Sequence, residues 1–315
     1  MNGKCEQMVV RRLGVALLAG LSMVVLAGWS GGAVAQQVLA ASSMADQPDG
    51  ALVPPVSASA FTATQLDNVL AGNQRSATNR ARDVYRHPKA TLQFFGIRPD
   101  QTVIEIAPGG GWYSEILAPL LHNNGRYIAA VAAPAAAKAG SQSDSPLQKK
   151  FAADPAHYEN AQWLQFQAKA PVLGKPDSAD RVLTFRNVHN WIAADTAPAM
   201  FKAFFAVLRP GGVLGVVEHR ADEPTSLASM KQSGYVSTAY VVKLATEAGF
   251  VADGSSEINA NPKDTKNYPK GVWTLPPTLE LGAQNRSKYL AIGESDRMTL
   301  RFIKPAVAAP ASVTR

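Results

Sequence analysis

The chain has 315 residues, a hydrophobic content of 46% and a formal net charge of +7 at pH 7. This length and composition suffice for one sizeable core and fit a single α/β domain with additions. Because the basic residues are scattered singly along the chain, the charge predicts a solubility feature and argues against a nucleic-acid partner.

Residues 1–35 have the pattern of a bacterial signal peptide. Lys4, Arg11 and Arg12 precede an apolar run, and Ala33-Val34-Ala35 supplies the small residues that a signal peptidase needs. The apolar run is shorter than the roughly 20 residues that span a bilayer. This length argues against the alternative, an uncleaved membrane anchor, and we expect a periplasmic or secreted protein without stable membrane insertion after cleavage.

We expect the mature chain to begin near Gln36. The only cysteine, Cys5, lies in the removed segment, so the mature chain is expected to have no disulfide, no thiolate metal site and no cysteine nucleophile. Residues 36–60 are rich in Ala, Ser and Pro without periodicity, which predicts a flexible linker. Residues 305–315 are expected to form a disordered tail, which leaves a domain at 61–304.

The domain is expected to begin with helices. Apolar residues recur at helical spacing from Thr64 to Phe95, and Pro88 marks a break, so the pattern predicts two or three helices before the first strand. The segment RDVYRHPKATLQFFGI is interpreted as a packing helix on its amphipathicity. The alternative is a lid over a site, in which the candidate acceptor contacts are Tyr85, Arg86 and His87.

Strand and helix patterns then alternate, as a doubly wound, mostly parallel sheet requires. The expected strands are Thr102–Ala107, Arg126–Val131, Gln162–Gln167, Arg181–Phe185, Val213–Glu218, Phe250–Ile258 and Met298–Ile303. The expected helices are Trp112–His122, Pro146–Ala153, Ala194–Leu208 and Ser237–Ala248, the third ending in a Pro-Gly turn within LRPGG. Residues 259–297 are a long insertion, and its Tyr268 and Trp273 predict an ordered flap over the pocket.

The segment VIEIAPGGGWYSEI places three glycines between a strand and a helix. Gly109, Gly110 and Gly111 permit close backbone approach and positive φ angles, and the first amides of the helix offer donors to an anion. A tight structural turn alone is the alternative. The spacing A-P-G-G-G-W departs from the dinucleotide fingerprint, and the second strand ends without an acid, which argues against a nicotinamide cofactor.

Four segments together resemble the class I S-adenosylmethionine-dependent methyltransferases, and more closely the predicted methyltransferases that carry bacterial export signals. They are VIEIAPGGGW, GRYIAAV, DRVLTFRNVHNW and LRPGGVLGVVEHR, and the resemblance covers Ala81 to Lys304. It implies a seven-stranded Rossmann-like sheet whose last two strands form an antiparallel hairpin. It also implies S-adenosyl-L-methionine as cofactor and methyl transfer to a small-molecule or other acceptor that the sequence does not identify.

The resemblance assigns the cofactor to the loops after the first and fourth strands, with Glu105 near its ammonium group and the loop amides near its carboxylate. A capping acid is the structural alternative for Glu105. The cofactor-binding candidates are Glu105, Ala107, Pro108, Gly109, Gly110, Gly111 and Asn187. The sequence departs from the family at Ala107, where a glycine is common, and lacks the usual adenosine-binding acids. In their place stand Val131, Ala132, Gln165 and Gln167.

Polar side chains follow the fourth and fifth strands, in RNVHNW and EHR. An imidazole can take a proton from an attacking oxygen or nitrogen near neutral pH, so His189 is the preferred candidate base over His219. The catalytic candidates are His189, Asn190 and Glu218, with Trp191 as a further residue that could face a substrate. The alternatives are a loop that caps the next helix and an Arg220–Glu218 ion pair. Because the adenosine-binding acids are missing, a non-catalytic or differently liganded binding protein of the same fold remains the alternative function.

Overall fold

In the computed structural model of the protein, residues 58–133 and 145–306 are described. All of them belong to a single unit, Pro54–Arg315. The expected signal peptide, and nearly all of the expected linker and tail, lie outside the described residues. None of the described helices combines the length and the apolar character needed to cross a membrane.

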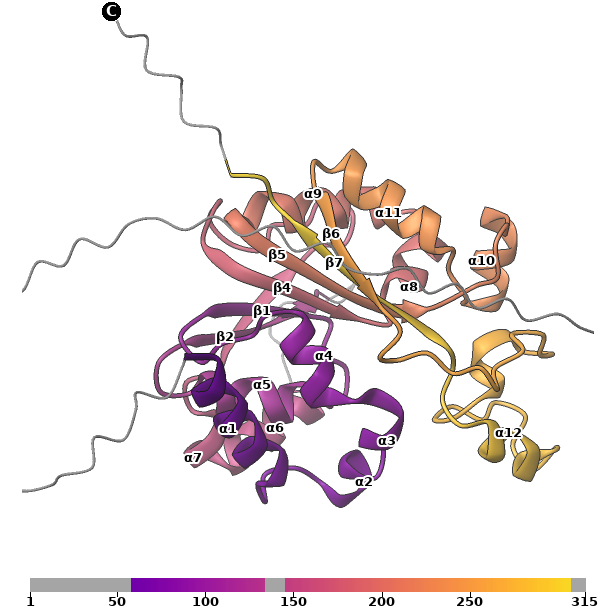
Figure 1. Ribbon diagram of the computed structural model, residues 1–315, viewed down its shortest axis with the longest axis horizontal. Coiled ribbons are helices and arrows are strands. Elements are labelled where there is room, and N and C mark those ends of the chain that lie inside the picture. Colours follow the sequence, from indigo (N-terminus) through magenta and orange to yellow (C-terminus); the bar gives the residue numbers. More distant parts are fainter. Residues whose placement is uncertain (1–57, 134–144, 307–315) are drawn as a thin grey trace, which may run out of the picture. The chain divides into compact units, whose positions relative to one another are not determined.

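Seven strands form one sheet in the order β3-β2-β1-β4-β5-β7-β6 (Figure 1). They are β1 (Thr102–Ile106), β2 (Arg126–Ala132), β3 (Gln162–Phe166), β4 (Ala179–Phe185), β5 (Leu208–His219), β6 (Val251–Ser256) and β7 (Arg297–Ile303). Strands β1 to β5 pair in parallel, whereas β7 runs antiparallel to both of its neighbours, β5 and β6. The expected doubly wound sheet with an antiparallel last hairpin is confirmed.

Helices cover both faces of the sheet (Figure 1). Their bounds are α1 (Ala58–Ala71), α2 (Ala77–Arg80), α3 (Asp83–Arg86), α4 (Pro88–Phe94), α5 (Ser114–Leu121), α6 (Pro146–Ala153), α7 (Pro155–Tyr158), α8 (Val188–Ala193), α9 (Ala197–Val207), α10 (Leu227–Ser233), α11 (Thr238–Glu247), the 3₁₀-helix η1 (Gly271–Thr274) and α12 (Arg286–Ile292). In the described residues before β1 there are four helices rather than two or three, because α2 and α3 are single turns that a periodicity over many residues does not resolve. Pro88 is the first residue of α4, as its fixed φ favours.

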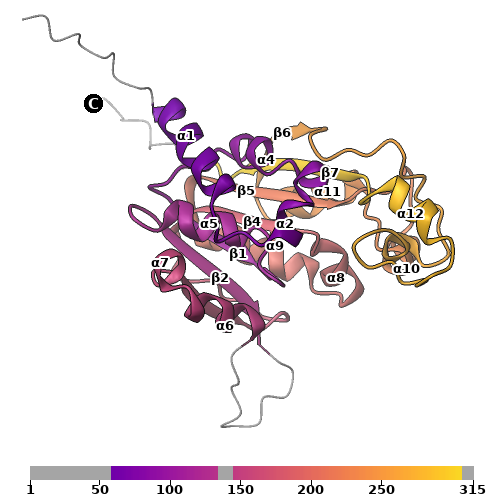
Figure 2. The same cartoon turned by 90° about the horizontal axis from the view of Figure 1, so that it is seen from below.

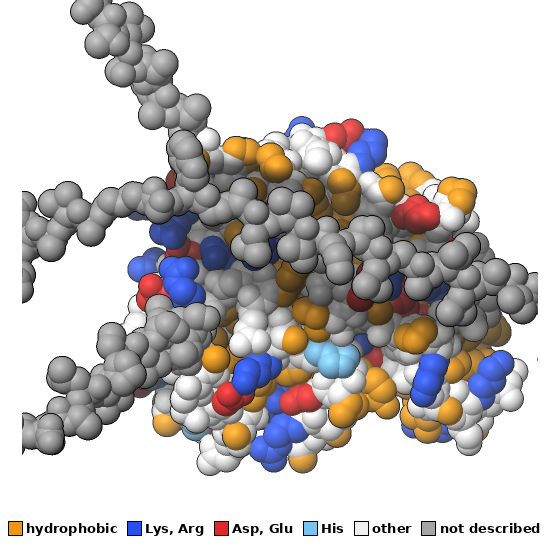
Figure 3. All heavy atoms as spheres, viewed as in Figure 1, with side chains coloured by type: hydrophobic (Ala, Val, Ile, Leu, Met, Phe, Trp, Pro, Cys, Tyr) orange, Lys and Arg blue, Asp and Glu red, His pale blue; other side chains and the backbone are white. Residues whose placement is uncertain are grey.

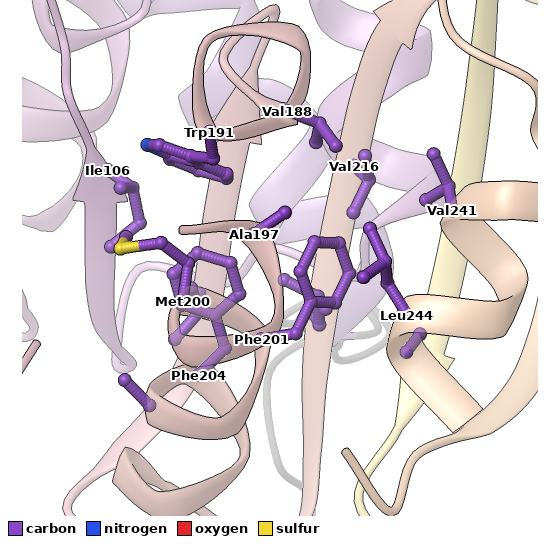
Figure 4. Close-up of a cluster of buried hydrophobic side chains, with 14 of the residues drawn as sticks. Ile106, Val188, Trp191, Ala197, Met200, Phe201, Phe204, Val216, Val241 and Leu244 are labelled. Carbon is purple, nitrogen blue, oxygen red and sulfur yellow. The ribbon is translucent and has the colours of Figure 1, made fainter. Parts of the chain in front are cut away.

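The apolar side chains between the sheet and helices α8, α9 and α11 form one core cluster (Figure 4). Met200, Phe201 and Phe204 of α9 are fully buried in it. Trp191 of α8 joins the same cluster, with its ring 5.5 Å from that of Phe204. The expectation that Trp191 faces a substrate was therefore wrong, because its large apolar ring fills the space between α8 and α9.

A second core cluster holds α1, α4, α5, α6 and α7 against the opposite face of the sheet. Ile116 and Leu117 of α5 are fully buried in it beside Val103 of β1. Phe151 of α6 stacks on Tyr158 of α7 at 4.2 Å. This packing fixes α5, and with it the glycine loop that precedes α5.

One strand and one helix begin at residues other than those expected. Strand β5 already begins at Leu208, which pairs with Ala179 before the ladder shifts register and resumes at Val213. The segment LRPGG is thus the irregular start of the strand, with Gly211 at φ +77°. The expected helix Ala194–Leu208 starts at Ala197 and is preceded by the separate helix α8.

The insertion between β6 and β7 contains η1 and α12. Figure 2 shows α8, α10 and α12 at the same end of the sheet. On the face drawn in Figure 3, the described Lys and Arg side chains lie interspersed with Asp and Glu. That part of the surface therefore mixes both signs of charge.

Candidate functional site

A cavity of about 230 Å³ lies beyond the carboxyl ends of β1 and β4. These strands are adjacent in the sheet, and the chain order reverses between them, which is where open α/β sheets bind ligands. We call it the loop cavity, because the backbone from Ala107 to Gly110 lines one side of it. Its other polar lining residues are Asn79, Arg82, Arg86, Glu105, Arg186 and Asn187.

The glycine loop combines two local environments. An added Cβ at Gly109 or Gly110 would meet nothing within 4 Å, so both glycines border open space at the cavity. An added Cβ at Gly111 would lie 2.3 Å from Cδ1 of Leu147, and Gly111 has φ +80°. Gly111 therefore serves the turn and the packing of α6, whereas Gly109 and Gly110 leave room for a ligand.

Ala107 adopts φ +49°, the left-handed conformation for which glycine is the usual residue. Its amide donates to the carbonyl of Ala130 at 2.8 Å, which holds the turn against β2. The loop thus keeps its shape despite the departure from glycine, at the cost of local backbone strain. Ala107 and Pro108 both line the loop cavity.

Glu105 is 2% exposed and lines the loop cavity from below. Its Oε2 accepts hydrogen bonds from Ser114 Oγ at 2.8 Å and from Tyr127 Oη at 2.7 Å. Burial raises the pKa of Glu105 to about 7, although these two hydrogen bonds oppose the rise. Both donors are side chains, so Glu105 is not the backbone cap that was its alternative reading. It is a carboxylate that a bound cation would help to ionise.

Asn187 connects the ends of β4 and β1. Its Nδ2 donates to the carbonyl of Ile106 at 3.0 Å, and its side chain lines the loop cavity. The residues considered for the adenosine half of a cofactor lie elsewhere: Val131, Ala132, Gln165 and Gln167 do not line this cavity. The described loop cavity therefore matches an amino-acid moiety better than a whole nucleoside.

A second cavity of about 250 Å³ adjoins the loop cavity, because Arg82, Arg86 and Arg186 line both. We call it the histidine cavity after His189 and His219 in its wall. The insertion between β6 and β7 contributes the wall formed by Val272, Trp273, Pro276, Pro277 and Thr278. The insertion thus lies where the sequence predicted a flap.

His189 is held by Glu218. Its Nδ1 lies 3.0 Å from Oε1 of Glu218 and donates to it, since an ionised carboxylate only accepts. Glu218 also accepts the backbone amides of Val188 at 2.6 Å, His189 at 3.3 Å and His219 at 2.8 Å. This arrangement leaves Nε2 of His189 as the ring nitrogen available to a ligand.

His219 lies beside His189, with 5.3 Å between the ring centroids. Burial lowers the pKa of His219 well below its ordinary value, and His189 and Arg186 lower it further. Its Nδ1 lies 2.6 Å from Ser295 Oγ. One ligand atom each from His189, Glu218 and His219 lie within 4.8 Å of one another. Because four N–H groups already donate to Glu218, we assign it an orienting role and assign no metal here.

Other expected residues take different places. Asn190 is exposed and lines neither cavity. Arg220 pairs with Asp296 at 2.8 Å and with Glu257 at 2.6 Å, so the expected alternative of an Arg220–Glu218 pair was wrong. Glu218 is turned instead toward the start of α8.

The segment that was interpreted as a packing helix is divided between α3 and α4, and one of its side chains reaches the site. Arg86 is 2% exposed and lines both cavities. Tyr85 and His87 are exposed and line neither. The lid alternative thus identified one residue of the site correctly.

Sequence reasoning missed Arg82 and Arg186. Arg82 and Arg86 are four residues apart, a spacing that puts two side chains on one face of a helix, and Arg186 directly precedes Asn187. The carboxylate of Glu294 accepts from Arg82 Nε at 2.7 Å, Arg86 Nε at 3.0 Å and Arg297 Nη1 at 3.0 Å. These contacts bring the start of the domain to the start of β7.

No protein-family model matches the sequence, and a search of curated proteins finds no relative. Solved structures are similar in fold. The [4+2]-cyclase SpnF has a TM-score of 0.51 at 14% identity, covering 79% of this chain and 97% of its own. A SAM-dependent methyltransferase from Aquifex aeolicus has a TM-score of 0.47 at 11% identity, covering 77% and 98%. SAM-dependent methyltransferases from Methanosarcina mazei give 0.44 at 15% identity, covering 69% and 97%.

The strand order, with antiparallel β7 between β5 and β6, is that of the class I methyltransferase fold. The likeness at a TM-score of 0.51 agrees with it over four fifths of the chain. The resemblance that the sequence carries is therefore confirmed at the level of the fold. At these identities the reaction has to be argued from the site.

Proposed function

We propose that the protein is an S-adenosyl-L-methionine-dependent methyltransferase that acts on a small-molecule acceptor. The observation that carries the proposal is the loop cavity, in which open space at Gly109 and Gly110 adjoins the buried carboxyl of Glu105. Amides of a glycine loop favour a carboxylate, and a buried carboxyl whose pKa is about 7 favours an adjacent ammonium group. The two partners match the two charges of an amino-acid moiety.

When bound, S-adenosyl-L-methionine supplies an electrophilic methyl group, whose bond to sulfur breaks as the acceptor forms its new bond to carbon. Gly109 and Gly110 would hold the carboxylate, and Glu105 the ammonium group. Asn187 fixes the end of β4 against β1 through Ile106, which keeps the cavity wall in place. Positioning of this kind supplies most of what methyl transfer needs from a protein.

His189 is the base in this proposal. Glu218 holds Nδ1, so Nε2 can take the proton that an oxygen or nitrogen acceptor loses. Glu218 touches neither cavity and acts through His189 as a positioning residue. The histidine cavity is accordingly the acceptor site, because it contains His189 and shares three residues with the loop cavity.

Calorimetric titration with S-adenosylhomocysteine tests the cofactor assignment. We expect saturable binding with one site per chain, weakened about tenfold or more in Glu105→Gln, which removes a charge partner of the ammonium group. Glu257→Gln is the matched control, because Glu257 is exposed and lines neither cavity. Absence of saturable binding to the wild-type protein would contradict the proposal.

A second candidate function is a differently liganded or non-catalytic protein of the same fold. It is favoured by the absence of residues from the ends of β2 and β3 in the described loop cavity. A structure whose title names a [4+2]-cyclase shares the fold, and one fold supports several reactions. The same titration separates the candidates, since this second one predicts no affinity for S-adenosylhomocysteine.

We further propose that the protein is exported and acts in the periplasm or outside the cell. The proposal is supported by the succession of basic, apolar and small residues in 1–35. Removal of Cys5 with this segment would leave a mature chain that needs no thiol chemistry in an oxidising compartment.

A further inference from the structure

Three arginine side chains in the walls of the two cavities each have one buried nitrogen without a hydrogen-bond partner. The atoms are Arg82 Nη2, Arg86 Nη1 and Arg186 Nη1. Buried donors are nearly always satisfied in proteins, since an unmet one costs about 1–3 kcal/mol and more when charged. Arg86 is 2% exposed, so bulk water does not readily supply the partner. The three groups need a ligand with acceptor atoms.

The charges around these groups do not balance. Arg82, Arg86 and Arg297 all donate to Glu294, the one carboxylate hydrogen-bonded to them. Arg297 is satisfied, because its remaining nitrogens donate to the carbonyls of Ser295 and Tyr85. With Arg186, four guanidinium groups lie near two carboxyl groups, those of Glu294 and of Glu105 in the loop cavity, so positive charge exceeds negative charge by at least two.

The electrostatics agree with this count. Burial, and after it the charge of Arg186, lower the pKa of Arg86 to about 9. Burial alone would raise the pKa of Glu294, yet Arg297, Arg86 and Arg82 lower it to about 2. A bound anion would relieve the repulsion that these shifts report.

S-adenosylmethionine does not supply this anion. It carries one carboxylate, one ammonium and one sulfonium group, so its binding adds net positive charge to the pair of cavities. Its carboxylate also has partners of its own in the amides at Gly109 and Gly110. The second ligand is then the one that must bring negative charge.

The backbone conformation of Arg186 also supports an anion site. Arg186 has φ +60°, a conformation that costs a non-glycine residue energy and that concentrates at functional sites. Its amide donates to the carbonyl of Val217 at 2.7 Å, so the sheet holds the strained residue in place. This conformation places the Arg186 guanidinium group in the walls of both cavities. In the histidine cavity it shares the wall with His189.

We propose, on the basis of the proposed function, that the methyl acceptor is a small anionic molecule whose carboxylate or phosphate group binds Arg82, Arg86 and Arg186 in the histidine cavity. Guanidinium groups bind both oxyanions through parallel N–H donors. The acceptor atom of such a molecule lies next to Nε2 of His189, and Trp273 covers it. The arginines select the class of acceptor, and His189 takes its proton.

Calorimetry on the full chain at low ionic strength tests this assignment. Inorganic phosphate and succinate are the two probes, each titrated with and without saturating S-adenosylhomocysteine. We expect one of the probes to bind under both conditions, which also distinguishes phosphate from carboxylate. Arg186→Gln should weaken that binding about tenfold or more, a larger change than in the affinity for S-adenosylhomocysteine, because Arg186 lines both cavities.

Arg98→Gln is the matched control, because it removes the same charge from a side chain that pairs with Asp100 outside both cavities, and it should bind the probe as the wild type does. Arg82→Gln, at a partly exposed position, repeats the test if Arg186→Gln does not fold. The proposal is overturned if neither probe binds the wild type, or if the probe competes with S-adenosylhomocysteine and Arg186→Gln weakens both ligands equally. Binding of a probe without any binding of S-adenosylhomocysteine would support the anion site while contradicting the proposed cofactor.

Discussion

Gly110 and Gly111 are neighbours in the chain but differ in what a side chain would meet. An added side chain at Gly110 projects into open space at the loop cavity, and its φ is not in the left-handed region. Gly110→Leu should therefore lower the affinity for S-adenosylhomocysteine by about 100-fold or more, while the melting temperature stays near that of the wild type. Calorimetry and thermal unfolding measure the two effects.

Gly111→Ala is the contrasting variant. Its Cβ meets Leu147, and φ +80° strains any residue with a side chain, so it should cost about 2–4 kcal/mol of the free energy of unfolding. If Gly110→Leu bound the ligand normally, the cofactor would lie away from the loop.

The pKa of Glu105, about 7, makes cofactor binding depend on pH. Below pH 7 the folded protein holds this carboxyl protonated and neutral, and an ammonium ligand must displace the proton. The affinity for S-adenosylhomocysteine should therefore rise with pH from 5 and level off near 7, by up to about tenfold per pH unit. Calorimetry between pH 5 and 8 measures the rise, and Glu105→Gln should remove it. An equal slope in that variant would assign the pH dependence to another group.

His189→Ala tests the base. The rate of methyl transfer should fall by roughly 10² to 10⁴, with little change in cofactor affinity, because the ring lines the histidine cavity and not the loop cavity. Single-turnover kinetics on an anionic acceptor found by a methyl-transfer screen measure the rate. A variant with wild-type turnover and an unchanged pH–rate profile would show that His189 only packs beside Glu218.

At the scale of elements, Glu294 joins helix α3 and its N-cap Arg82 to strand β7. Its pKa is lowered from 4.5 to about 2, so its stabilisation is present above pH 4.5 and is lost as the pH falls from 4.5 to 2. Glu294→Gln should cost about 3 kcal/mol of the free energy of unfolding at pH 7. Denaturant unfolding at pH 7 and at pH 3 measures the loss, which should shrink at the lower pH. A loss of equal size at both values would mean that packing, not charge, accounts for it.

The sequence predicted the elements with strong apolar patterns. Six of the seven strands lie within two residues of their expected bounds. The signal is clearest for β1 and β4, which are short and mostly buried apolar runs, whereas β6 is exposed along nearly all of its length. Helix α8 was missed because VHNWIA is too short to show a helical period, and its first amides are satisfied by Glu218, a residue 30 positions away from Val188. Such a contact is tertiary, so no local pattern records it.

The site was predictable where one loop builds it and not where distant segments meet. Glu105, Gly109, Gly110 and Asn187 follow adjacent strands, and strand order alone places them together. Arg186 directly follows β4 and could have been placed with Asn187, whereas Arg82 is held at the site by Glu294, more than 200 residues away in the chain. Asn190, adjacent to His189, was chosen by its chemistry, but the turn of α8 directs it to solvent.

For the whole molecule, the proposed export predicts the size of the mature chain. Signal-peptidase cleavage after Ala35 should give a mature amino terminus near Gln36. Mass spectrometry of the protein from the periplasm or medium of its native host measures that terminus. Cytoplasmic material with an intact Met1 or Met8 would contradict both cleavage and export.

The position of β7 has a consequence for the order in which the protein becomes functional. Strand β7 lies between β5 and β6, although it is the last of the three in the chain, and Glu294 just before it contacts Arg86, 208 residues earlier. Contacts over such separations form slowly, since the chain must lose the conformational entropy of a long loop before any contact stabilises the fold. A folding chain can therefore complete the fold around the glycine loop while its proposed acceptor site is still in two separate pieces. Ligand selectivity is then the last property that this chain acquires as it folds.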